Sequence, residues 1–150
     1  MKKSNLYKII IAIVVIILVT SGIIIGNTLT SQNKTEGNKT VTITIEDQVD
    51  NKTLLDNEVF HTNADTLEQF LTENKDTLKV DMVKEATYGD YLVGLYGLKT
   101  TDMNKGPWWI YSYSDPAAKL DYKVGYAPSI DKINLGKENY MTFVFTSDIG

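Results

Sequence analysis

Two segments in which apolar and polar residues alternate constrain the fold of this chain more than any other feature of its sequence. One is residues 41–45, Val-Thr-Ile-Thr-Ile, and the other is residues 140–145, Tyr-Met-Thr-Phe-Val-Phe. A period of two residues places alternate side chains on opposite faces of an extended strand. Each segment therefore predicts a β-strand with one buried face, and the two strands open and close one domain.

The residues between these strands predict one short helix and four further strands. Asp65 is a candidate N-cap, and Glu68, three residues later, completes a capping box before apolar residues at helical spacing up to residue 71. The expected strands cover residues 54–62, 78–85, 91–96 and 108–113. One helix near the front of a series of strands predicts an α+β fold, in which a mixed or mostly antiparallel sheet packs on that helix.

The N-terminus predicts export from the cytoplasm. Three lysines at positions 2, 3 and 8 precede an apolar run over residues 9–25, a pattern typical of a signal peptide or a membrane anchor. We favour an uncleaved anchor with a cytoplasmic N-terminus, because the run is long and no Ala-x-Ala cleavage site follows it. The expected organisation is a signal-anchor or signal peptide over 1–26, a flexible linker over 27–40, and one extracytoplasmic domain over 41–150.

The composition argues against several classes of partner. Residues 41–150 contain 10 Lys and 18 Asp plus Glu, a net charge of −8, and the chain has no Arg. This charge disfavours nucleic acid and anionic lipid as partners of the domain. The absence of Cys excludes disulfides and thiolate metal ligands. The Lys- and Asn-rich composition without Arg is typical of an AT-rich genome and suggests a Gram-positive bacterium.

Catalytic chemistry is scarce in this sequence. His61 is the only histidine, and no Gly-x-Ser-x-Gly motif is present, so a Ser-His-Asp hydrolase is not predicted. The carboxylates match no calcium loop, and we interpret them as solvated surface groups. We therefore expect no catalytic residue, no metal site and no enzymatic activity.

The aromatic segment over residues 105–113 is the candidate binding site. On a strand, Trp108 shares a face with Ile110, whereas Trp109 shares the opposite face with Tyr111 and Tyr113. One interpretation places both tryptophans in the core. We expect instead that one face lines a site, that Trp109 is the exposed tryptophan, and that an aromatic loop closes over the strand. The candidate ligand-binding residues are Trp108, Trp109, Tyr111, Tyr113 and Tyr126.

The order of these segments resembles a known family. The opening Val-Thr-Ile-Thr-Ile strand, the helix near 66–71, Gly-Leu-Tyr-Gly at 94–97, Gly-Pro-Trp-Trp-Ile-Tyr at 106–111 and the closing strand follow the family's order. The family comprises small bacterial surface domains similar to the C-terminal domain of transcobalamin and intrinsic factor. Ser-Asp at 114–115 replaces the usual Asn-Gly turn, and Lys-Glu-Asn at 137–139 replaces the common Gly-Asp pair.

The resemblance implies a fold and a ligand class. It implies a β-grasp-like mixed sheet around one helix, and cobalamin or another flat corrinoid-like ligand. The corresponding domain of transcobalamin covers one face of cobalamin, while a separate helical domain holds the other. The function we expect is a membrane-tethered extracytoplasmic binding module that acts with an uptake system. The alternative is a surface module that binds an exported partner protein through the same aromatic residues.

Overall fold

The computed structural model describes residues 36–149, and these lie in the second of two units, residues 35–150. The predicted segment 1–26 and most of the predicted linker 27–40 lie outside the described residues. Among residues 36–149, no helix is long and apolar enough to cross a membrane.

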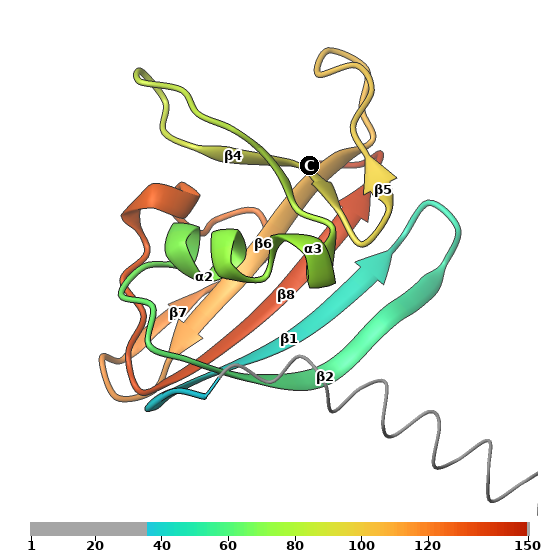
Figure 1. The fold of residues 1–150 in the computed structure, drawn as a ribbon. Coiled ribbons are helices and arrows are strands. Elements are labelled where there is room, and N and C mark those ends of the chain that lie inside the picture. The colour runs from blue at the N-terminus through green and yellow to red at the C-terminus, as the bar shows by residue number, and fades with distance from the viewer. Residues whose placement is uncertain (1–35, 150) are drawn as a thin grey trace, which may run out of the picture. The chain divides into compact units, whose positions relative to one another are not determined.

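The described chain is a mixed α+β fold with a core built mostly from sheet and few helices (Figure 1). The first half contains β1 (Lys39–Asp47), β2 (Lys52–Thr62), α2 (Leu67–Glu73), α3 (Lys75–Leu78), β3 (Asp81–Val83) and β4 (Tyr91–Leu95). The second half contains β5 (Leu98–Lys99), β6 (Trp108–Asp115), β7 (Leu120–Tyr122), the 3-10 helix η1 (Ile130–Lys132) and β8 (Glu138–Thr146).

Five strands form the larger sheet in the order β2-β1-β8-β6-β7. The two strands predicted from alternation, β1 and β8, are neighbours and run parallel, while every other pair in this sheet is antiparallel. A smaller antiparallel sheet has the order β3-β4-β5. The expectation of a mixed sheet is therefore confirmed.

The core lies on one face of the larger sheet, which we call the inner face. Val41, Ile43 and Ile45 of β1 are fully buried there, as the alternation predicts. Helix α2 covers this face in Figure 1 and buries its own apolar residues against it. The rings of Phe60 and Phe70 meet edge to face with centroids 5.7 Å apart, an arrangement that adds to the stability gained by burial.

The helix begins one residue later than predicted. Its N-cap is Thr66, whose hydroxyl accepts a hydrogen bond from the Gln69 backbone N–H, and Gln69 Oε1 accepts one from the Asp65 N–H. Thr66 and Gln69 thus cap the helix, rather than Asp65 and Glu68, and the Gln69 side chain accepts from the residue before the N-cap instead of from the N-cap itself. The prediction chose the wrong register because both tetrads have the required spacing.

The predicted strand over 78–85 is wrong at its start. Leu78 ends the short helix α3, and Lys79 follows with a left-handed φ of 51°. Only the three residues of β3 are extended in a ladder. Leu78 is buried all the same, so its apolar character reports core packing and does not distinguish helix from strand.

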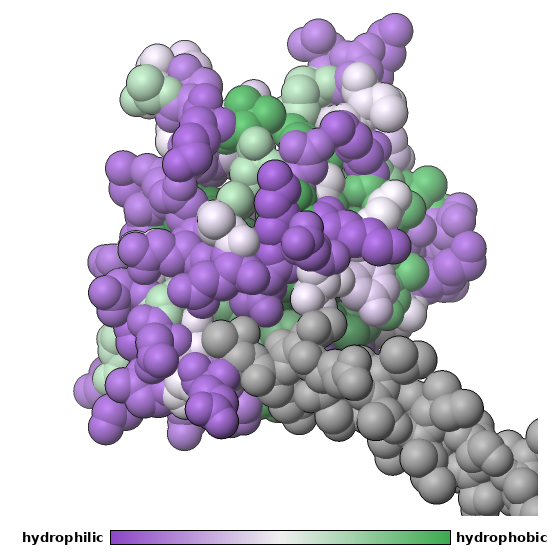
Figure 2. Space-filling model, viewed as in Figure 1, coloured by the Kyte–Doolittle hydropathy of each residue, from purple (hydrophilic) through white to green (hydrophobic). Residues whose placement is uncertain are grey.

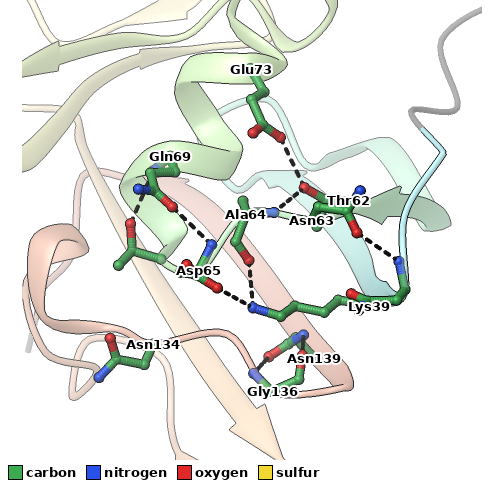
Figure 3. A network of polar contacts seen from close by, with 12 residues as sticks. Lys39, Thr62, Asn63, Ala64, Asp65, Gln69, Glu73, Asn134, Gly136 and Asn139 are labelled. Atoms are coloured by element: carbon green, nitrogen blue, oxygen red, sulfur yellow. Dashed lines mark hydrogen bonds and ion pairs between the residues drawn. The ribbon is translucent and has the colours of Figure 1, made fainter.

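A polar network holds the start of β1 against the segment between β2 and α2 (Figure 3). Lys39 Nζ donates to the Ala64 carbonyl at 2.8 Å and pairs with Asp65 Oδ1 at 2.9 Å. Thr62 Oγ1 donates to Glu73 at 2.9 Å and accepts from the Ala64 N–H. Because Thr62 is fully buried, these bonds satisfy polar atoms that would otherwise be costly to bury.

Candidate functional site

The outer face of the larger sheet, opposite the core, is built from cross-strand rows. We define this face by the outward residues of β1, β8 and β6 with their neighbours on β7. The register gives three successive rows, which are Thr42–Tyr140–Ser114, Thr44–Thr142–Ser112 and Glu46–Val144–Ile110. On β7, Asp121 extends the first row beside Ser114. Trp108 lies beyond the third row, opposite Thr146.

Trp109 lies on the inner face and not on an exposed one. It is only 7% exposed, its ring centroid is 4.9 Å from that of Phe145, and its indole N–H points at the Leu98 carbonyl. The expectation that Trp109 is the exposed tryptophan is therefore wrong. The period-two pattern divides the two tryptophans correctly, but it does not say which face the helix covers.

Tyr113 is also a core residue. It is 1% exposed, and its hydroxyl lies 2.9 Å from the Asn134 carbonyl oxygen and 3.1 Å from Asn139 Oδ1. Burial, with the nearby charge of Asp115, raises the pKa of Tyr113 to about 12. The phenol therefore stays protonated and donates a structural hydrogen bond.

Tyr111 is partly buried on the same inner face and donates its hydroxyl proton to the Pro128 carbonyl. Burial raises the pKa of this phenol well above its usual value, and the charge of Asp131 adds to the shift. Asp131 keeps that charge because its hydrogen bond with Lys132 holds its own pKa below the usual range. Tyr111 thus ties the 123–128 loop to β6.

Trp108 and Tyr126 are the two predicted site residues with accessible rings. Trp108 is half-buried on the outer face, and its indole N–H donates to the Met103 carbonyl at 2.8 Å. Tyr126 is 80% exposed. The loop that carries Tyr126 approaches β6 near Trp108. A Cβ on Gly125, next to Tyr126, would lie 3.9 Å from Cδ1 of Ile110, which is two residues along β6 from Trp108.

We call this region the aromatic end of the outer face. Its residues are Met103, Trp108, Ile110, Val124 and Tyr126. Met103 is 48% exposed and Val124 is 37% exposed. Exposed apolar groups beside an aromatic ring can bind an apolar ligand surface or a protein partner.

The described residues show no cluster of metal-ligating side chains. His61 lies on β2, as predicted. Within residues 36–149, no three His, Asp or Glu side chains are placed to hold one metal ion. Asp47 and Asp115 are buried carboxylates, and each accepts two backbone N–H bonds from the turn that follows it. Those bonds give both residues a role in turn formation.

The hydroxyl-bearing residues of the outer face are not recognisable as a group from the sequence pattern. Thr42 and Thr44 stand out in the sequence only as the polar half of an alternation. Their positions on one face follow from the period of two, but their grouping requires the order of the strands, which alternation does not give.

Together, the sheet order and the two faces define a mixed α+β protein whose accessible sheet surface has an aromatic end and a hydroxyl-rich middle. No family model matches the chain, and no curated protein matches it. Among solved structures, it is similar to a protein of Ruminococcus gnavus ATCC 29149 described as a "putative metal binding protein", with a TM-score of 0.54 and 19% sequence identity. The match covers 73% of this chain and 98% of that one. At this identity the similarity extends to the fold alone.

Proposed function

We propose that this chain is a non-catalytic extracytoplasmic binding module, tethered to the membrane or secreted, that takes cobalamin or another flat corrinoid-like ligand in cooperation with an uptake system. The observation that carries the proposal is the aromatic end of the outer face, where Trp108 is accessible and fixed by its bond to the Met103 carbonyl. A ring held in this way loses little conformational entropy when it packs on a flat ligand.

We further propose that the fold is a β-grasp of the kind implied by the resemblance to transcobalamin C-terminal domains. Helix α2 packs on a mixed sheet whose central strands, β1 and β8, are parallel and come from opposite ends of the domain. That arrangement supports the assignment.

Two changes in the site follow from burial. Trp109 and Tyr113 support the strand from below and need not touch the ligand, since both belong to the core. Trp108 and Tyr126 supply the accessible rings, and Tyr111 holds the loop that carries Tyr126.

The test is a titration of the full chain, purified in mild detergent, with cobalamin, followed by Trp fluorescence and the visible spectrum of the ligand. Trp108→Ala is expected to weaken binding at least tenfold. Tyr88→Ala, which removes a ring that is 86% exposed and does not belong to the aromatic end, is the matched control and should bind as the parent does. No saturable change up to high micromolar cobalamin would reject a corrinoid ligand.

The second candidate function is a surface module that binds an exported partner protein. The exposed side chains of Met103, Val124 and Tyr126 favour it, because apolar and aromatic residues dominate binding energy at protein interfaces. Capture of a specific envelope protein that is lost with Trp108→Ala, without any response to cobalamin, would support this candidate over the first.

A further inference from the structure

A pocket of about 210 Å³ lies on the outer face, away from the aromatic end. Its lining takes in the first two cross-strand rows and the bulge of β2. The lining residues with polar side chains are Thr42, Thr44, Asn57, Ser112, Ser114, Asp121, Tyr140 and Thr142, with Tyr122 at the border and Tyr113 and Met141 beneath. Tyr140 and Trp108 lie six residues apart in register along β8, a separation of about 20 Å.

The chemistry of this lining is unusual for a solvent-facing sheet of this protein. Of the eleven lining residues only Asp121 is charged, although 23% of the chain is charged and its exposed loops carry many Lys, Asp and Glu. In one complete row, Thr44–Thr142–Ser112, every side chain carries a hydroxyl group. A pocket lined by hydroxyls and an amide suits an uncharged, polar ligand better than an ion.

Several of these polar groups have hydrogen-bonding capacity left over. Ser112 Oγ accepts from the Thr142 N–H at 3.1 Å, and Thr44 Oγ1 accepts from the Asn57 N–H at 3.2 Å. Both hydroxyl protons therefore remain available for a ligand. Within residues 36–149, no hydrogen bond to another residue is found for the hydroxyls of Thr42, Thr142 and Tyr140 or for the Asp121 carboxylate.

The pocket also offers one ring for stacking. Tyr140 is 45% exposed at the centre of the first row, between Thr42 and Ser114. A sugar ring combines hydroxyl groups around its edge with an apolar C–H face, so it needs an exposed aromatic ring beside closely spaced donors and acceptors. Tyr140 and the hydroxyl row beside it supply both.

We propose that this pocket binds one residue of an uncharged sugar chain, with Tyr140 against the face of the sugar and the hydroxyls of Thr44, Ser112 and Thr142 at its edge. The pocket volume is below the range of about 300–1,000 Å³ that is typical of sites for drug-sized ligands. It therefore accommodates a single sugar unit while the rest of the chain runs over the sheet. Asp121 accepts from a sugar hydroxyl and repels acidic sugars. The site is separate from the aromatic end and does not depend on the proposed corrinoid function.

The test is affinity electrophoresis and calorimetry of the full chain with three neutral probes, cellohexaose, maltohexaose and an N-acetylglucosamine hexamer, and with oligogalacturonate as the acidic counterpart. At least one neutral probe is expected to bind, and oligogalacturonate to bind at least tenfold more weakly. Tyr140→Ala should weaken binding at least tenfold, and Thr142→Val about threefold or more. Tyr88→Ala is the matched control for loss of an exposed ring.

The outcomes separate this site from the aromatic end. Trp108→Ala should leave sugar binding unchanged, and Tyr140→Ala should leave any response to cobalamin unchanged. If Tyr140→Ala fails to fold, Thr142→Val decides, because it keeps the shape of the side chain and removes only the hydroxyl. Absence of binding by all neutral probes, equal binding of oligogalacturonate, or loss of sugar binding with Trp108→Ala would overturn the proposal.

Discussion

At the scale of single residues, the aromatic strand β6 shows how neighbouring identical residues take different roles. Trp109 belongs to the core, whereas Trp108, one position earlier, is half-buried on the outer face. The sequence predicts that adjacent tryptophans point to opposite sides, and the structure agrees. Which side is buried depends on where α2 packs, and that information lies more than 30 positions away in the sequence.

The first prediction contrasts these two tryptophans. Trp109→Ala should lower the free energy of unfolding by about 3–5 kcal/mol, because it leaves a cavity beside Phe145. Trp108→Ala should cost less, about 1–3 kcal/mol, because its ring is only partly buried and lies outside the core. Urea denaturation of both variants measures the difference, and equal losses would contradict the assigned faces. The fluorescence remaining in Trp108→Ala should be blue-shifted, as expected for a buried indole.

The second prediction concerns alkaline stability. The pKa of Tyr113 is about 12 in the folded protein and about 10 in an unfolded chain. The folded state therefore keeps this proton more tightly, so its contribution to stability is complete below pH 10 and is lost as pH rises from 10 to 12. Two pKa units correspond to about 2–3 kcal/mol across that window.

Tyr113→Phe should remove about half of the stability loss between pH 10 and 12, because Tyr111, whose pKa burial also raises, titrates over the same window and contributes the rest. The variant should also lower the neutral-pH stability by about 1 kcal/mol through the lost hydrogen bond. Denaturation midpoints at pH 8, 10 and 11 would test it. Tyr88→Phe, at an exposed position, serves as the control and should follow the parent at every pH. An unchanged slope in Tyr113→Phe would contradict the assignment.

At the scale of secondary structure, long alternating segments were predicted well and short elements were not. Alternation located β1 and β8, because every second residue along most of each strand is buried. The pattern gave no warning of α3 or β7, since four and three residues are too few to establish a period. The ends of loops and the caps of helices depend on single hydrogen bonds. The sequence often allows an alternative bond one or two residues away.

The third prediction distinguishes the two possible N-caps of α2, Thr66 and Asp65. Thr66→Ala should destabilise the protein by about 1 kcal/mol, because the Gln69 N–H loses its acceptor. Asp65→Ala removes only the exposed pair with Lys39 and should cost about 0–0.5 kcal/mol. Thermal unfolding of the two variants compares them directly. A larger loss of stability for Asp65→Ala than for Thr66→Ala would support Asp65 as the N-cap.

At the scale of the whole described unit, function depends on the contrast between the two faces of one sheet. The inner face and α2 form the core, and the outer face presents an aromatic end and a hydroxyl pocket. The view from the helix side is mainly hydrophilic, with hydrophobic residues visible only in patches (Figure 2). The sequence predicts the α+β class because strand and helix periods differ. The outer-face residues are brought together by the parallel pairing of β1 with β8, whose paired residues are nearly 100 positions apart in the sequence.

The fourth prediction is that residues 36–150 fold without the segment that precedes them. All residues of the buried core lie between Val41 and Phe145, and Asn63 fixes the start of the described chain through bonds to Glu36 and Asn38. The fragment should therefore unfold in one cooperative transition, with an enthalpy of about 80 kcal/mol near 60 °C for a domain of this length. Differential scanning calorimetry of the fragment provides the measurement. A broad transition with much lower enthalpy would mean that the preceding residues contribute to the core.

Shortening the fragment to residues 41–150 removes Lys39, which begins β1 and donates to the Ala64 carbonyl. That shorter fragment should melt several degrees lower, because the polar network at the start of α2 loses its central cation.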